Sequence, residues 1–208
     1  MNHKNFSKSV TVSAALVLAI ASFASPVASA AVITSAFTQT STNGNHNDFS
    51  GERAVVSDAY SEDHRGLVEF NIASLAPFSA ATLNFNVFSD SGGTMAMTLV
   101  SYDGNGVYSM SGDYSAAATS LVSSFSTTSF ATGSVMSFDI SASLASAVAN
   151  SKNFIGYRFA RQGTGATVDF RNFSIVTTAA AVPEPTSVAL IGFGVLGLLA
   201  SRRKSRKV

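Results

Sequence analysis

Short segments in which apolar and polar residues alternate dominate the middle of the chain. Residues 65–72 place Val68, Phe70 and Ile72 on one side, and residues 81–88 repeat this pattern. Alternation with a period of two indicates strands that bury one face and expose the other, which is typical of antiparallel sheets. Segments of the same kind are found at 95–99, 136–140, 155–159 and 168–175, with weaker candidates at 32–39 and 53–59.

Turn signals and one helical segment complete the pattern. Gly, Asn and Asp cluster between the strands, and a one-residue shift in the alternation predicts a β-bulge near Asn172. Residues 141–150 have helical spacing, with Leu144 and Val148 four residues apart and a serine suited to the N-cap. Residues 115–132 are weakly patterned and read as a loop with one possible strand. The sequence therefore predicts an all-β fold, an antiparallel β-sandwich of jelly-roll type with one short helix.

The first thirty residues have the layout of a secretory signal peptide. Two lysines precede an apolar run at residues 10–24, and Ala28 and Ala30 provide an A-x-A cleavage site. We expect cleavage after Ala30, so that residues 1–30 are removed and the mature chain starts at Ala31 outside the cytoplasm. An uncleaved membrane anchor is the alternative, but the apolar run is short and contains several serines.

The C-terminal end combines a proline-rich triplet, an apolar run and a basic cluster. The triplet is Pro183, Glu184 and Pro185, and the apolar, glycine-rich run lies within residues 186–201. As a helix this run would span about 24 Å, somewhat less than the roughly 30 Å hydrocarbon core of a bilayer. The prolines stop the helix at its start and leave the triplet extended. The basic cluster comprises Arg202, Arg203, Lys204, Arg206 and Lys207. By the positive-inside rule it keeps this end in the cytoplasm.

This order of features resembles the PEP-CTERM sorting signal of Gram-negative bacteria, here over residues 179–208. The resemblance implies that an exosortase-like membrane protease reads Pro183–Pro185, while residues 186–201 hold the precursor in the inner membrane and 202–208 form a basic tail. After processing, the protein would reach the cell surface or be secreted. The same type of tail is also called an ice-binding protein C-terminal domain, a name that is no evidence of ice binding. An ordinary tail anchor is the alternative and would have the same orientation.

Residues 64–87, HRGLVEFNIASLAPFSAATLNFNV, resemble the DNRLRE-type extracellular domains. They contain Arg-Gly, a strand that ends in Phe-Asn, a turn, and Ala-Thr-Leu at the start of the next strand. Residues 138–160 are similar to a later part of these domains. The resemblance implies that residues 31–178 form a jelly roll similar to carbohydrate-binding modules. Asn71 stands where these domains usually have Asp.

Charge is unevenly distributed. Residues 31–182 contain six basic and eleven acidic side chains, a net charge of −5. This acidic region argues against nucleic-acid binding, which requires cations to displace phosphate counterions. The chain contains no cysteine, which excludes disulfide scaffolds, zinc ribbons and thiol catalysis.

Acidic side chains gather before residues 65–72 and could supply oxygen ligands for one Ca²⁺, a hard cation that suits extracellular jelly rolls. A solvated loop face is the alternative. No other cofactor is expected. The candidate ligands are Asp48, Glu52, Asp58, Glu62 and Asp63.

Motifs for catalysis are not found in the sequence. It has no G-x-S-x-G and no H-E-x-x-H, and the histidines after residue 30, His46 and His64, lie in polar segments that read as solvated loops. We therefore expect a non-enzymatic exported protein with a structural or adhesive role in the bacterial envelope or in the exopolysaccharide matrix of a biofilm. The alternatives are a carbohydrate-binding module and, less favoured, a small polysaccharide hydrolase. Tyrosines that could stack on sugars or pack at strand edges are Tyr60, Tyr102, Tyr108 and Tyr114.

Overall fold

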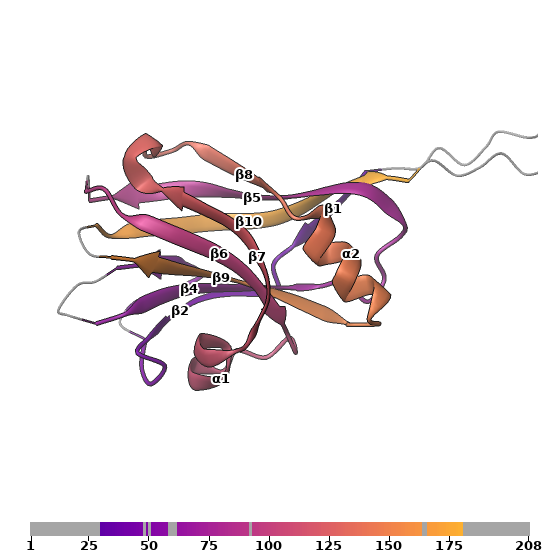
Figure 1. The fold of residues 1–208 in the computed structure, drawn as a ribbon, viewed down its shortest axis with the longest axis horizontal. Helices are drawn as coiled ribbons and strands as arrows, with labels where there is room; N and C mark the ends of the chain where they lie inside the picture. Colours follow the sequence, from indigo (N-terminus) through magenta and orange to yellow (C-terminus); the bar gives the residue numbers. More distant parts are fainter. Residues whose placement is uncertain are drawn as a thin grey trace, which may run out of the picture. The chain divides into compact units, whose positions relative to one another are not determined.

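Two antiparallel sheets lie face to face in the computed structural model (Figure 1). The structure describes residues 30–47, 49, 51–57, 62–91, 93–163 and 166–180. The strands in this part are β1 (Ala31–Thr34), β2 (Phe37–Thr42), β3 (Ala54–Val56), β4 (His64–Asn71), β5 (Phe78–Asp90), β6 (Ala96–Asp103), β7 (Ala118–Ser126), β8 (Val135–Asp139), β9 (Phe154–Gln162) and β10 (Val168–Ala179). The predicted antiparallel β-sandwich is therefore confirmed.

The order of the strands shows how the chain crosses between the sheets. The first sheet has the order β1-β10-β5-β8, with β3 also paired to β10, and the second sheet has the order β2-β4-β9-β6-β7. From β3 to β10, β6 and β7 are the one pair of consecutive strands that stays in the same sheet. Strands β3, β10, β5 and β8 thus face β4, β9, β6 and β7, which agrees with the wrapping of a jelly roll.

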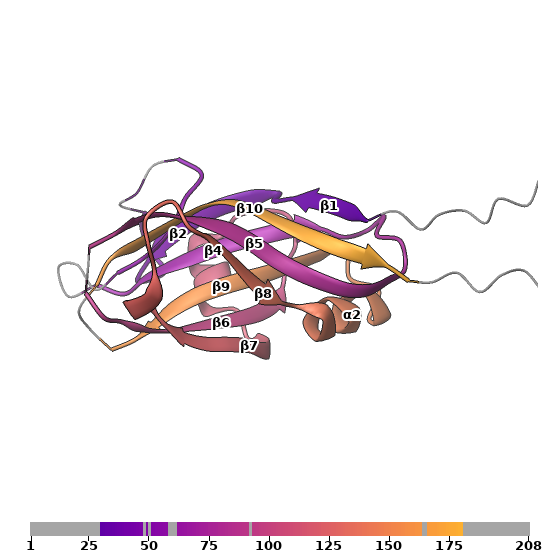
Figure 2. The same ribbon diagram turned by 90° about the horizontal axis from the view of Figure 1, so that it is seen from above.

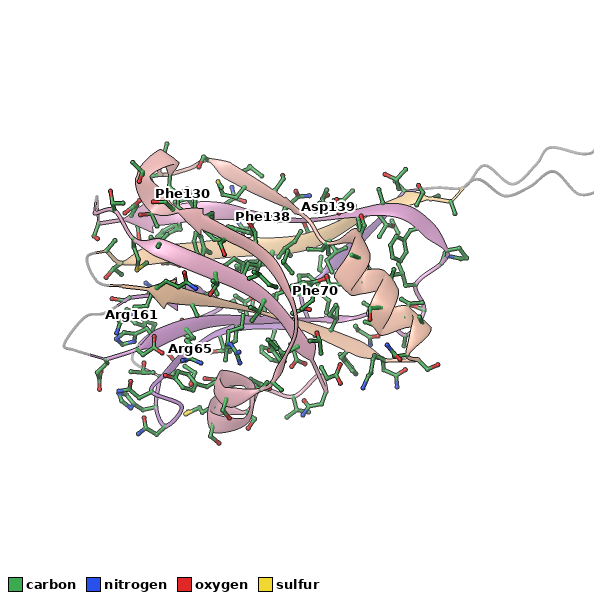
Figure 3. All side chains as sticks on the ribbon, viewed as in Figure 1. Arg65, Phe70, Phe130, Phe138, Asp139 and Arg161 are labelled. Atoms are coloured by element: carbon green, nitrogen blue, oxygen red, sulfur yellow. The ribbon has the colours of Figure 1, made fainter. Side chains whose placement is uncertain are left out.

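Aromatic rings from both sheets meet in the core. Phe85 of β5 lies 5.1 Å from Phe159 of β9 and 4.9 Å from Phe170 of β10, measured between ring centroids. Phe70 of β4 belongs to the same cluster, and the partly buried Phe138 of β8 packs against it (Figure 3). Because each buried aromatic side chain contributes about 1.5–3 kcal/mol, this cluster accounts for much of the attraction between the sheets.

The predicted bulge in the last strand is present. The pairing of β5 with β10 shifts between Arg171 and Ser174, and Asn172 has a φ of 57°. Asparagine tolerates this left-handed conformation better than most residues. The extra residue returns the next side chains to the core. The core residues on either side of the bulge are Val168, Phe170, Phe173 and Ile175.

Two segments form strands that differ from those predicted from the sequence. The segment predicted as one strand at 32–39 forms β1 and β2, which are separated at Ser35 and Ala36 and pair in different sheets. The segment 115–132, read as a loop with one possible strand, contains the nine-residue strand β7. Strand β7 lies at the edge of the second sheet, where its side chains are largely exposed, so its sequence lacks a strong apolar alternation.

Two α-helices occur in the described residues, where the sequence predicted one. Helix α2 (Ser141–Ala149) is the predicted helix, whereas α1 (Met110–Ser115) was missed. The hydroxyl of Ser109 caps α1 by accepting a hydrogen bond from the backbone nitrogen of Gly112. A helix of six residues is too short to show an apolar period, so the cap was its main sequence signal.

Helix α2 differs from its prediction in its cap and in its buried face. Its N-cap is Ile140, and the carboxylate of Asp139 accepts the hydrogen bond from the Ser141 backbone nitrogen. Leu144 is buried as expected, but Val148 is 40% exposed. The buried face continues instead through small residues, which allow the helix to lie close to the sheets. The buried residues of α2 are Ser143, Leu144 and Ala147.

Candidate functional site

Most residues of the predicted sorting signals lie outside the described part of the chain. They comprise Ala28, Pro183, Glu184, Pro185, Arg202, Arg203, Lys204, Arg206 and Lys207, together with the apolar segment 186–201. Ala30 is described and exposed, and β1 begins at the next residue. Among the residues that the structure describes, none of the helices has the length and apolar character needed to cross a bilayer.

The predicted acidic metal cluster is described only in part. Asp48 and Asp58 lie outside the described residues, and Glu52 is exposed. Glu62 faces His46, with 3.5 Å between its Oε1 and the histidine Nε2. Within the described ranges, no three His, Cys, Asp or Glu side chains are grouped as metal ligands. The Ca²⁺ site therefore stays a prediction from the sequence.

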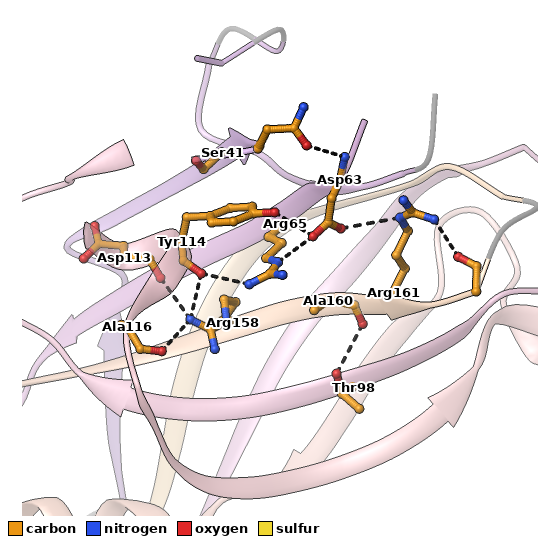
Figure 4. Close-up of polar contacts among 12 residues, drawn as sticks. Ser41, Asp63, Arg65, Thr98, Asp113, Tyr114, Ala116, Arg158, Ala160 and Arg161 are labelled. Atoms are coloured by element: carbon orange, nitrogen blue, oxygen red, sulfur yellow. Dashed lines mark hydrogen bonds and ion pairs between the residues drawn. The ribbon is translucent and has the colours of Figure 1, made fainter. Parts of the chain in front are cut away.

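Asp63, the remaining candidate ligand, is the centre of a polar cluster next to α1 (Figure 4). Its Oδ2 accepts hydrogen bonds from the Tyr114 hydroxyl at 2.7 Å and from Arg65 Nε at 2.8 Å, and its Oδ1 lies 3.4 Å from Arg161 Nε. Burial by itself would raise the pKa of Asp63, but the Tyr114 hydrogen bond and the two guanidinium groups outweigh burial and lower it. Both carboxylate oxygens are thus already engaged by donors from the protein.

Two arginines of the second sheet form hydrogen bonds with the C-terminal end of α1. Arg158 Nη1 donates to the carbonyl oxygens of Asp113 at 3.2 Å, Tyr114 at 3.0 Å and Ala116 at 2.8 Å. Arg65 Nη1 donates to the same Tyr114 carbonyl at 3.0 Å, and its guanidinium lies 4.0 Å from the centre of the Tyr114 ring. Carbonyls at a helix C-terminus lack partners within the helix, so the arginines satisfy them. The polar cluster around Asp63 thus serves to hold α1 against the second sheet.

Glu69 of β4 is buried beneath the loop that joins β6 to α1. Its Oε2 accepts hydrogen bonds from the backbone nitrogens of Asn105 at 3.0 Å and Gly106 at 2.7 Å. A Cβ atom at Gly104 would lie 2.7 Å from the Glu69 carboxyl carbon, so glycine permits the loop to come this close. Burial raises the pKa of Glu69, and the hydrogen bond from Gly106 opposes this rise. The alternation in residues 65–72 predicts that the side opposite Val68 and Phe70, which carries Glu69, is exposed; at Glu69 this is wrong because the loop covers it.

The described tyrosines do not form an exposed stacking platform. Tyr102 is 1% exposed. Tyr108 is half-buried and donates from its hydroxyl to the Thr40 carbonyl at 2.9 Å, whereas Tyr114 is bound to the Asp63 cluster. Tyr60 lies outside the described residues. These contacts favour packing over sugar stacking for the three candidate tyrosines that are described.

The two histidines occupy different environments. His64 is the first residue of β4 and is 1% exposed, so the prediction that it is solvated is wrong. Its Nδ1 lies 2.8 Å from the Thr42 hydroxyl on the neighbouring strand β2. His46 is 44% exposed at its side chain and contacts Glu62.

A pocket of about 650 Å³ lies between β7 and α2. Asp139, where β8 leads into α2, lines it (Figure 3), as do Asp103 at the end of β6 and Lys152 before β9. Lys152 Nζ donates to Asp103 Oδ2 at 2.7 Å. Hydrogen bonds from Ser141 lower the pKa of Asp139. No local pattern in the sequence marks this pocket, because its lining comes from separate segments.

Comparison with family models places a PEP-CTERM protein-sorting motif at residues 181–204. The match includes the triplet Pro183–Pro185, the apolar segment 186–201 and the first three basic residues. No curated protein matches the sequence. The resemblance of residues 64–87 to DNRLRE-type domains thus remains a sequence prediction. The motif indicates an exported, membrane-anchored precursor that an exosortase-like membrane enzyme processes for the cell surface. The chain is therefore identified as a carrier of the PEP-CTERM protein-sorting motif.

Proposed function

We propose that this chain is a non-enzymatic surface protein whose β-sandwich serves a structural or adhesive role in the envelope or exopolysaccharide matrix of a Gram-negative bacterium. The observation that carries the proposal is the sorting motif at residues 181–204, which follows a β-sandwich in the same chain. The apolar segment 186–201 anchors the precursor in the inner membrane. An exosortase-like protease then reads Pro183–Pro185 and releases the sandwich toward the surface.

The charged groups around α1 support a scaffold role over catalysis. A general acid or base must come within hydrogen-bond reach of a substrate. Glu69 is instead covered by backbone of the β6–α1 loop, and Asp63 is engaged by a tyrosine and two arginines. Arg158 is 9% exposed and holds the end of α1. These groups are used to fix the fold, as an extracellular structural domain without disulfides requires.

Recognition by the protease is tested by replacing Pro183, Glu184 and Pro185 with alanine in a host that carries an exosortase. Export and insertion should persist because the apolar segment and the basic cluster remain, whereas processing should stop. Full-length protein should then accumulate in the inner membrane, as measured by fractionation and intact mass. A control that replaces Thr186 and Ser187 with alanine should be processed as the wild type. Normal trimming and release of the triple-alanine variant would replace this proposal with a tail anchor shed by general proteolysis.

Retention in the membrane is tested separately through the basic cluster. We expect replacement of its five residues by glutamine to remove the positive-inside signal, so that the tail follows the sandwich across the membrane. Uncleaved protein should appear in the periplasmic fraction. Retention of the glutamine variant in the inner membrane would show that the basic cluster is not the stop. The residues to change are Arg202, Arg203, Lys204, Arg206 and Lys207.

The adhesive role is tested with cells that lack the protein. Attachment to a surface and retention of matrix polysaccharide should both fall, and expression of the wild-type chain should restore them. Expression of the triple-alanine variant should not restore them, because its sandwich stays at the inner membrane. Unchanged attachment in cells without the protein would exclude the adhesive role.

A further inference from the structure

The pocket between β7 and α2 has the dimensions of a ligand site. Its volume of about 650 Å³ falls within the roughly 300–1,000 Å³ that is usual for pockets that bind small molecules. It exists because α2 lines it with small side chains, which leave the space between helix and strand unfilled. These side chains are Ala142, Ser143, Ser146 and Ala147.

Apolar and polar groups are both present in the pocket. Ile140 and Ile155 are buried, at 1% and 2% exposed, and Leu121 of β7 contributes an apolar side chain that is 63% exposed. Hydroxyl and amide groups complete the lining. They include Thr119, Ser120, Ser146 and Asn150. This combination matches a pyranose ring, which carries apolar C–H groups and several hydroxyl groups that need hydrogen-bond partners.

Some of the polar groups are held in place by neighbouring side chains. The Ser101 hydroxyl lies 2.8 Å from the Thr119 hydroxyl and 2.7 Å from the Ser120 hydroxyl. Asp139 Oδ1 accepts a hydrogen bond from the Ser141 backbone nitrogen at 2.9 Å. Groups that are fixed before a ligand arrives lose less entropy on binding. The pocket is therefore partly preorganised.

The charges of the pocket restrict the kind of sugar. The positive charge of Lys152 is balanced by Asp103, with which it forms an ion pair at 2.7 Å. This balance leaves the pocket with the negative charge of Asp139. A carboxylate can accept hydrogen bonds from sugar hydroxyls or from an ammonium group, and it repels an acidic sugar.

We propose that the pocket between β7 and α2 binds a neutral or amino sugar residue of a polysaccharide, an inference that deepens and rests on the proposed adhesive role. The hydroxyl and amide groups bind the sugar hydroxyls, and the aliphatic side chains contact its C–H face. Asp139 accepts from the sugar and discriminates against uronic acids. The sandwich would then attach to the matrix through its own fold after the sorting tail has delivered it.

The test uses the full-length protein in mild detergent and three oligosaccharides of equal length. Cellotetraose is neutral, a glucosamine tetramer carries ammonium groups, and tetragalacturonate carries carboxylates. Saturation-transfer NMR and calorimetry should detect binding of the neutral or the amino tetramer and none of tetragalacturonate. Absence of binding by both of the first two, or binding of tetragalacturonate alone, would overturn the proposal.

Variants on α2 locate the binding site. Ser146→Leu places a bulky side chain in the pocket and should lower affinity by roughly tenfold or more. Ala145→Leu is the matched control, because Ala145 is exposed on the same helix and does not line the pocket. It should bind as the wild type. Equal binding by Ser146→Leu and the wild type, with both folded by circular dichroism, would place the sugar elsewhere and overturn the proposal.

The role of Asp139 is tested with asparagine, which can still accept the hydrogen bond from Ser141. Asp139→Asn should weaken binding of the amino tetramer by roughly tenfold, since a hydrogen bond to a charged group is lost, and should affect the neutral tetramer less. An unchanged affinity for both tetramers would exclude Asp139 from the site. All pocket variants should be processed and reach the surface normally, so failure of sugar binding is distinguishable from failure of sorting.

Discussion

Strands β4 and β5 lie in opposite sheets and have similar alternating sequences, but the middle of β4 is buried on both sides, whereas β5 keeps one side half-open to solvent. On β5, Leu83, Phe85 and Val87 are buried, and the residues between them are half-buried. On β4, the outward-facing Leu67 and Glu69 are both 0% exposed. Alternation therefore shows which side of a strand faces the core. The exposure of the other side depends on whether another segment folds over it.

The segment that joins β6 to β7 covers the outward side of β4. It includes α1 and lies on the side of the second sheet that faces away from the core (Figure 1). Glu69 binds its first turn, Ser41 Oγ donates to the Met110 carbonyl at 2.9 Å, and Arg158 binds the end of α1. Figure 2 looks onto the first sheet, where no helix of the described residues crosses β5 or β10. The second sheet thus has an additional outer layer.

The largest effect is expected within the second sheet, on the side that the outer layer covers, where Tyr102 packs against the backbone of the neighbouring strand. A Cβ atom at Gly156 of β9 would lie 2.2 Å from Cζ of Tyr102 on β6. Gly156→Ala should therefore displace the ring and lower the free energy of unfolding by about 3 kcal/mol. Urea unfolding followed by circular dichroism measures this change. Ala80→Val is the matched control, because Ala80 is exposed on β5, and it should cost less than about 0.5 kcal/mol. Similar costs for both variants would contradict the difference between the sheets.

A smaller effect is expected when α1 loses its attachment. Arg158→Met leaves the carbonyls of Asp113, Tyr114 and Ala116 without this donor and should lower stability by about 2 kcal/mol. Hydrogen exchange should show loss of protection in α1, while the amides of β5 remain protected. Arg158→Lys should be intermediate, because an ammonium group cannot reproduce the planar donor geometry of arginine. Equal loss of protection in α1 and β5 would show that the outer layer does not unfold separately.

The parts of the fold that depend on neighbouring residues in sequence were predictable. The alternating sequence of β5 correctly predicted a strand, and the one-residue shift in the alternation near Asn172 correctly predicted the bulge. Helix α1 was missed because its stability depends on Arg65 and Arg158, which come from strands more than forty residues away in sequence. The burial of Glu69 was missed for the same reason, since the covering loop is distant in the chain.

The sorting motif and the pocket also differ in how far the sequence alone predicts them. The sorting motif is a linear signal, read by the order of Pro183–Pro185, the apolar segment and the basic cluster, so the sequence alone was enough to identify it. The pocket brings together Asp103, Asp139 and Lys152 from separate segments. Their proximity is a consequence of the strand order, and no spacing in the sequence reports it.

The smallest effect is expected for the charge that the outer layer buries. Burial raises the pKa of Glu69 above its value in the unfolded chain, so the folded protein retains this proton more strongly. The contribution of Glu69 to stability is therefore fully present below the unfolded pKa and is lost as pH rises through the folded pKa.

Glu69→Gln cannot ionise and can still accept hydrogen bonds from the Asn105 and Gly106 backbone nitrogens. Raising the pH from about 4 to about 8 should lower the melting temperature of the wild type through the ionisation of Glu69. In Glu69→Gln this part of the decrease should be absent. Glu52→Gln, at an exposed position, should keep the pH profile of the wild type. If Glu69→Gln also kept that profile, the loop over β4 would not bury a titrating charge, and the contrast with β5 would be one of packing alone.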